Sequence, residues 1–258
     1  MTTATAFDGA SIAYEVAGDG PAIVFVHGIT ESRRSWDPLI EPLARDHRVV
    51  AVDLRGHGGS ERRPPYDALT MAADLRAVMD AAGAMDPLVV GHSLGGAVVS
   101  VYAAANPVRG VVSVDQPLEL GGFQALLKPL EPVLRGDEAD FLTLIQQIFE
   151  SLYGALSPDE RRRIESHSHP EQDVVLGAWD LVLGATPDEL DELTRSTARM
   201  ITAPYLALHG NDPGAAYVAW LEDVVPTAAF ELWPNLGHYP HLVEPDRFVT
   251  RVRELSRG

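Results

Sequence analysis

The chain has 258 residues, of which 46% are hydrophobic and 22% are charged, values typical of a globular protein with one principal domain. Its 37 acidic and 20 basic side chains give a net charge of −17 at pH 7, which disfavours nucleic acid and anionic membrane surfaces as partners. Cysteine is absent, which excludes disulfides and thiol chemistry. The first twenty residues lack the basic and apolar regions of a signal peptide, and no apolar stretch is long enough to cross a bilayer, so we expect a cytoplasmic protein.

Short apolar segments alternate with longer segments of helical periodicity, the pattern of a mostly parallel sheet with helices on both faces. We predict strands, each buried on both faces, at residues 22–27, 48–53, 87–91, 110–115, 204–210 and 228–233. Helices are predicted at residues 36–45, 70–82, 94–105, 215–224 and 245–255. Two opening segments, residues 3–7 and 11–16, alternate polar and apolar side chains and suit an antiparallel edge.

Residues 116–198 break this rhythm, because they contain helical periodicity without a convincing buried strand. The segment is too long for an ordinary connection between two elements of a sheet. We therefore expect a helical cap at 116–198, inserted into a core formed by residues 1–115 and 199–258.

The segment Gly91-His92-Ser93-Leu94-Gly95-Gly96 joins a predicted strand to a predicted helix. A nucleophile on such a strand-to-helix turn needs small neighbours, which the glycines supply. The turn exposes the Ser93 hydroxyl at a helix N-terminus, where backbone N–H groups favour developing negative charge. A glycine-rich turn with an incidental serine has the same local pattern, so other residues must decide between the two interpretations.

A serine nucleophile requires a base and an acid that orients the base. His238 lies in the loop between the strand at 228–233 and the last helix, and Asp212 follows the strand at 204–210. All three side chains then lie at the carboxyl ends of parallel strands, where sites in open α/β sheets form. The backbone N–H groups of Leu94 and of Ile29, in the loop after the first parallel strand, suit an oxyanion hole.

These motifs together resemble the capped α/β-hydrolases of the esterase, lipase and C–C hydrolase type. The segments that carry the resemblance are VHGIT at 26–30, VVAVDLRGHGGS at 49–60, GHSLGG at 91–96, HGND at 209–212 and GHYPHLVEP at 237–245. The resemblance implies an α/β fold with an eight-stranded sheet, with Ser93 as nucleophile, His238 as base and Asp212 as acid. In many members the acid follows the strand-end glycine by three residues, whereas Asp212 follows Gly210 by two.

Several other residues could be mistaken for site residues. Asp115 ends the strand at 110–115, where some members of the superfamily carry the acid, and it remains the alternative to Asp212. The group Asp53, Arg55 and His57 forms a structural turn in relatives. His167 and His169 alternate as metal ligands can, but no third ligand accompanies them. No nucleotide or zinc-protease motif is present, so no cofactor and no metal is implied.

Serine at position 93 predicts acyl transfer, in which Ser93 attacks a carbonyl, the Ile29 and Leu94 amides hold the oxyanion and His238 moves the proton. Hydrolysis of a carboxylic ester of a small, largely apolar substrate is the expected reaction, by a monomer or a homodimer. A lactonase, a C–C bond hydrolase and a perhydrolase would use the same residues. A ligand-sensing protein and an inactive structural relative remain the alternatives outside enzymes. We expect the substrate to contact apolar side chains, mostly of the cap: Trp36, Phe123, Leu126, Leu127, Phe141, Ile148, Phe149, Trp179, Leu181 and Leu183.

Overall fold

One eight-stranded sheet organises the computed structural model, which describes residues 2–257. Its strands lie in the order β1-β2-β4-β3-β5-β6-β7-β8, and only β1 and β2 are antiparallel to their neighbours. The strand bounds are β1 Thr2–Thr5, β2 Ser11–Ala17, β3 Ala22–Val26, β4 Arg48–Val52, β5 Leu88–His92, β6 Gly110–Val114, β7 Tyr205–His209 and β8 Ala228–Leu232. The predicted mostly parallel sheet with an antiparallel edge is therefore confirmed.

The central strands are buried on both faces because their alternating side chains enter two separate apolar clusters. In β3, Val24 and Val26 join one cluster, while Ile23 and Phe25 join the other. The prediction of full burial is wrong for β8, in which no residue is buried. Since β8 is the last strand of the sheet, it has a neighbour on one side alone.

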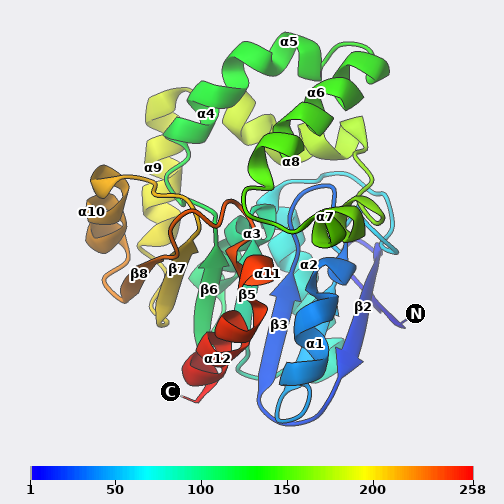
Figure 1. Cartoon of the computed structure of the whole chain (residues 1–258), viewed down its shortest axis with the longest axis vertical. Coiled ribbons are helices and arrows are strands. Elements are labelled where there is room, and N and C mark those ends of the chain that lie inside the picture. The colour runs from blue at the N-terminus through cyan, green and yellow to red at the C-terminus, as the bar shows by residue number, and fades with distance from the viewer. Residues whose placement is uncertain (1, 258) are drawn as a thin grey trace.

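Helices cover both faces of this sheet (Figure 1). Apolar side chains of α1 and α12 belong to one cluster, and those of α2, α3 and α10 belong to the other. The bounds of the core helices are α1 Asp37–Leu43, α2 Ala68–Ala82, α3 Leu94–Ala105, α10 Ala215–Val224, α11 Pro240–Val243 and α12 Pro245–Ser256, with a 3₁₀ turn, η1, at Arg33–Trp36. The start of α2 lies two residues before the prediction because the Asp67 side chain caps it by accepting a hydrogen bond from the Thr70 N–H.

Between β6 and β7 the chain forms helices alone, and they gather beyond one end of the sheet (Figure 1). We call residues 121–198 the cap. Its helices are α4 Gly121–Leu127, α5 Glu131–Leu134, α6 Glu138–Leu152, α7 Pro158–Glu165, α8 Gln172–Gly184 and α9 Pro187–Ala198, with a 3₁₀ turn, η2, at Lys128–Leu130. None of the helices within residues 2–257 is long and apolar enough to cross a membrane.

Candidate active site

Ser93 occupies a strained turn between β5 and α3. Its backbone adopts φ 51° and ψ −125°, in the region that favours glycine, and its N–H donates to the Val114 carbonyl at 3.0 Å. A Cβ at Gly91 would lie 2.1 Å from the Gly95 carbonyl oxygen, and a Cβ at Gly95 would lie 2.1 Å from the Val26 carbonyl oxygen. The turn therefore requires glycine at both flanking positions, and it leaves Ser93 partly exposed at the end of β5.

His238 pairs with Asp115 at the carboxyl ends of the strands. The His238 Nδ1–H donates to Asp115 Oδ2 at 2.6 Å, and the Gly210 N–H donates to Asp115 Oδ1 at 2.9 Å. Burial alone would raise the pKa of Asp115, but the hydrogen bond and charge of His238, the Gly210 N–H and nearby His209 hold that pKa below its ordinary value. Asp115 is therefore a carboxylate at neutral pH, and with the proton on Nδ1 the His238 Nε2 is free to accept one from a hydroxyl.

The expected pairing of Asp212 with His238 is absent, and the structure corrects it: Asp115 contacts His238 instead. Asp212 is exposed, and its Oδ1 accepts a hydrogen bond from the Gly214 N–H at 2.8 Å, in the turn that leads into α10. Asp115 is the carboxylate at His238 because of strand register. Val114, the last residue of β6, pairs with His92 of β5, so Asp115, which follows β6, lies beside the turn at Ser93. The sequence analysis favoured Asp212 from its motif position and kept Asp115, an aspartate directly after a buried strand, as the alternative.

A hydrogen bond from His92 connects the loop that carries His238 to the turn at Ser93. The His92 Nε2–H donates to the His238 carbonyl oxygen at 2.9 Å, and the two imidazole rings lie 4.6 Å apart between centroids. Burial lowers the pKa of His92 well below its ordinary value, so the ring is neutral. Ser93 and His238 are therefore brought together through the residue that precedes the serine.

The loop after β3 presents the Ile29 amide. The His27 Nδ1–H donates to the Gly28 carbonyl oxygen at 2.7 Å, and the Leu54 N–H donates to His27 Nε2 at 3.0 Å. Because a trans peptide is planar, with its C=O and N–H on opposite sides, this contact turns the Ile29 N–H away from His27. Within residues 2–257 neither the Ile29 N–H nor the Leu94 N–H donates to a protein acceptor. A Cβ at Gly28 would lie 3.3 Å from the Ser93 Cβ, which places this loop beside the serine.

The cap covers this region with apolar side chains. Ile29 belongs to a buried cluster of cap residues, and Leu94 packs against that cluster. Of the predicted apolar residues, the cluster or its partly buried rim contains Phe123, Leu127, Phe141, Ile148, Phe149, Trp179 and Leu183. Leu126 and Leu181 are exposed, and Trp36 lies in the core, stacked on Phe25, so these three do not belong to it.

Asp53 and Arg55, which the sequence analysis assigned to a structural turn, make buried polar contacts. Arg55 is fully buried and forms a two-pronged ion pair with Asp74, with both N–O distances at 2.6 Å. Asp53 accepts from the Arg33 and Gly59 backbone N–H groups at 2.6 and 2.8 Å. These side chains hold the turn after β4 together.

The cap segment with alternating histidines contacts the loop that follows Ile29. The His167 Nδ1 lies 3.3 Å from the Ser32 hydroxyl, and the His169 N–H donates to the Thr30 carbonyl oxygen at 2.8 Å. Throughout the described part of the chain, no group of three or more potential ligands could hold a metal ion.

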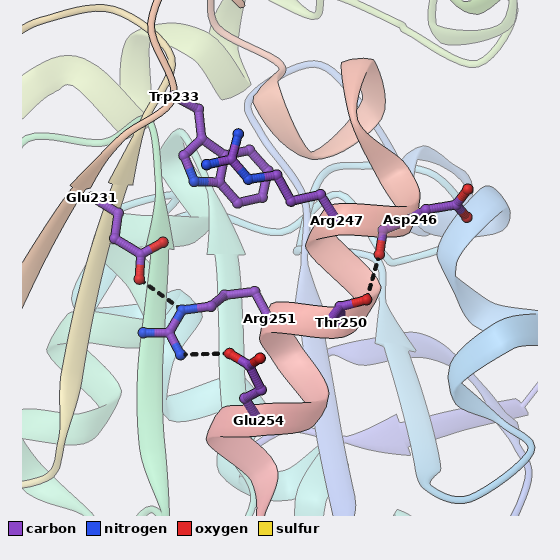
Figure 2. Close-up of a pocket in the computed structure, with 7 residues that line it drawn as sticks. All are labelled: Glu231, Trp233, Asp246, Arg247, Thr250, Arg251 and Glu254. Atoms are coloured by element: carbon purple, nitrogen blue, oxygen red, sulfur yellow. Dashed lines mark hydrogen bonds and ion pairs between the residues drawn. The ribbon is translucent and has the colours of Figure 1, made fainter.

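Two cavities lie outside the immediate surroundings of Ser93. A groove of about 460 Å³ runs along α12 and β8, and Figure 2 shows Arg251 in this groove paired with two glutamates. Arg251 pairs with Glu231 at 2.7 Å and with Glu254 at 3.1 Å, and the Arg247 guanidinium lies 4.0 Å above the Trp233 ring. The second cavity, of about 400 Å³, lies between the cap and the core, where α6 and α7 residues face Glu31 and Tyr239.

Comparison with known proteins identifies the family. The family model described as alpha/beta hydrolase fold matches residues 21–224. The chain belongs to this family. This α/β-hydrolase is 27% identical to the pimeloyl-[acyl-carrier protein] methyl ester esterase of Nitrosospira multiformis, over 96% of this chain and 98% of that protein.

Solved structures give the same assignment. The α/β-hydrolase resembles a putative aryl esterase from Burkholderia cenocepacia with a TM-score of 0.79 and 29% identity, covering 99% of this chain and 97% of that one. An esterase from a Rhodococcus species matches with a TM-score of 0.76 and 26% identity, over 100% and 98% of the two chains. The expected fold class is therefore confirmed, and relatives that span the whole chain are named as enzymes acting on esters.

Proposed function

We propose that this α/β-hydrolase is a serine carboxylesterase in which Ser93 is the nucleophile, His238 the base and Asp115 the acid. The observation that carries the proposal is the 2.6 Å contact of His238 Nδ1 with Asp115, in a loop that His92 fastens to the serine turn. The esterase names of the full-length relatives support the same reaction class.

In the proposed reaction, His238 Nε2 takes the hydroxyl proton as Ser93 Oγ attacks the ester carbonyl carbon. The Ile29 and Leu94 N–H groups stabilise the oxyanion of the tetrahedral intermediate. The intermediate collapses to an acyl-serine as His238 returns its proton to the leaving alcohol. Water then attacks the acyl group with His238 again as base, which releases the carboxylic acid and restores Ser93.

The proposed substrate carries a small or medium apolar acyl group. The reason is the apolar cap cluster, with members such as Phe141 and Trp179, that packs around Ile29 and Leu94. A net charge of −17 favours neutral esters over anionic ones, since an anion approaching the molecule is repelled.

Labelling and turnover test the proposal together. The folded protein is treated with a fluorophosphonate probe and digested, and its activity is measured on p-nitrophenyl esters of increasing chain length. We expect a single adduct at Ser93 and hydrolysis that Ser93→Ala abolishes. Lactones and a vinylogous diketone in the same panel distinguish the related reactions. A folded protein without an adduct at Ser93 would refute the nucleophile assignment.

A further inference from the structure

A carboxylate with no role in the proposed chemistry is buried under the loop that carries Ile29. Glu31 is 2% exposed. Its Oε1 accepts a hydrogen bond from the Tyr239 hydroxyl at 2.9 Å, and its Oε2 accepts one from the Ser35 hydroxyl at 2.6 Å. Tyr239 is fully buried and directly follows His238, while Ser35 lies on η1. Glu31 thus joins its own loop and the adjacent η1 to Tyr239, which lies 208 residues away in the sequence.

The Glu31 charge is compensated without a cation. Its nearest basic group is His92, whose Nδ1 lies 3.8 Å from Glu31 Oε1. That nitrogen carries no proton, because the His92 Nε2–H donates to the His238 carbonyl and burial keeps the ring neutral. No lysine or arginine within residues 2–257 forms an ion pair with Glu31. A buried charge is costly unless hydrogen-bonded, so both hydroxyl donors are held in place by the carboxylate.

The Tyr239 hydroxyl remains a donor over the whole working pH range. Burial raises the pKa of Tyr239 well above its ordinary value, and the charge of Glu31 adds to this effect. The contact therefore joins a charged acceptor to a neutral donor, which is the stronger class of hydrogen bond.

Glu31 contacts residues that are adjacent to two of the proposed catalytic groups. Tyr239 follows His238, and His92 precedes Ser93. Glu31 itself lies two residues after Ile29, whose amide is a proposed oxyanion donor. We propose that Glu31 is a positioning residue, whose carboxylate holds the oxyanion loop and the base loop in register; this inference rests on the proposed esterase function. A donor displaced by a fraction of an ångström stabilises the oxyanion less, so the effect falls on kcat rather than on KM.

Four variants separate positioning from stability. Glu31→Ala removes both contacts, Tyr239→Phe removes one hydroxyl, and Glu31→Gln keeps an acceptor of the same shape. Tyr205→Phe is the matched control, because Tyr205 is equally buried and its hydroxyl bonds to Ser100 at 3.1 Å, in the helix-packed core. Melting temperature, kcat and KM on a p-nitrophenyl ester are measured for each variant.

We expect kcat to fall about tenfold in Tyr239→Phe and up to about 100-fold in Glu31→Ala, with KM within about twofold of the parent. Glu31→Gln retains most of the activity. The double variant Glu31→Ala/Tyr239→Phe is no slower than Glu31→Ala, because both changes break the same hydrogen bond. Tyr205→Phe loses stability while its kcat stays within about twofold. Equal kcat losses in the two Tyr→Phe variants would overturn the positioning role.

A spectroscopic measurement keeps this test separate from the proposed function. The imidazole Nδ1–H proton of His238, bonded to Asp115, is followed by NMR in the resting protein. We expect it to be sharp in the parent and in Glu31→Gln, and broadened in Tyr239→Phe. If the folded parent protein hydrolyses no ester, the esterase proposal is refuted, while the proposed role of Glu31 is still tested by the NMR measurement. An unchanged resonance in folded Tyr239→Phe would refute the role of Glu31, whatever the activity.

Discussion

Replacing Asp115 by asparagine tests the proposed acid most directly. In the parent, the two carboxylate oxygens accept from two donors, the His238 Nδ1–H and the Gly210 N–H. Asparagine has one acceptor oxygen and one NH₂ group in their place. In one arrangement the asparagine oxygen accepts from the Gly210 N–H and the NH₂ group faces His238. In the other, the oxygen faces His238, and the NH₂ group faces the Gly210 N–H, so that two donors oppose each other.

The second arrangement leaves a buried donor unpaired, which costs about 1–3 kcal/mol. The first arrangement is therefore favoured, and it forces the His238 proton onto Nε2, where the ring cannot accept a proton from Ser93. Loss of the Asp115 charge next to the developing imidazolium removes up to about 4 kcal/mol more, at an effective dielectric constant of about 20. We expect kcat to fall by roughly 10³ to 10⁴, equivalent to about 4–5.5 kcal/mol in the activation barrier.

The assay is steady-state hydrolysis of a short p-nitrophenyl ester at neutral pH, with the melting temperature measured on the same samples. Asp212→Asn is the control, because Asp212 is exposed and an asparagine oxygen can still accept from the Gly214 N–H. We expect its kcat within about twofold of the parent. A crippled Asp212→Asn and an active Asp115→Asn, both folded, would refute the reasoning from the 2.6 Å contact.

Three further outcomes are expected. Ile29→Pro deletes a proposed oxyanion donor and should lose roughly 10²-fold or more in kcat. Ile29→Ala should lose stability but keep its kcat within about threefold of the parent. Equal losses of kcat in the two variants would show that Ile29 acts through packing. Burial holds the pKa values of His27, His92 and His241 well below about 6.5. Below that pH the unfolded chain therefore binds more protons than the folded chain. The free energy of unfolding should decrease as the pH falls below about 6.5, by up to about 1.4 kcal/mol per pH unit for each ring. Urea titrations at several pH values measure this slope. His241→Phe should reduce it by up to about 1.4 kcal/mol per pH unit, and an unchanged slope would contradict the argument. Gly95→Ala places a carbon 2.1 Å from a backbone oxygen and should destabilise the fold by about 3 kcal/mol or more, measured by thermal unfolding; a parent-like melting temperature would show that the turn can relax.

Local pattern was enough to predict the parts of the site that depend on neighbours in the chain. The strained turn at Ser93 needs small flanking residues, and the glycines on either side of Ser93 in the sequence predict such a turn. The loop of His238 follows the last strand, as the alternation of strand and helix predicted. The orientation of the Ile29 amide, in contrast, depends on His27. The His27 ring donates to the Gly28 carbonyl oxygen and accepts from the N–H of Leu54, in the turn that follows β4. No spacing rule in the sequence shows that contact.

The sequence by itself determined the layered α/β architecture, because apolar alternation specifies which segments are buried. It also pointed to Ser93 as the proposed nucleophile, because glycines flank this residue at the spacing that the turn requires. The tertiary structure showed which of the two candidate aspartates contacts His238. Asp115 and Asp212 both follow a buried strand, but the register of β6 against β5 places one beside the serine, while a turn before α10 occupies the other. It also revealed the contact of Glu31 with Tyr239, which lies 208 residues away and therefore leaves no local pattern in the sequence. Strand register and the packing of distant loops are set by the whole core, which is why these assignments required the three-dimensional structure.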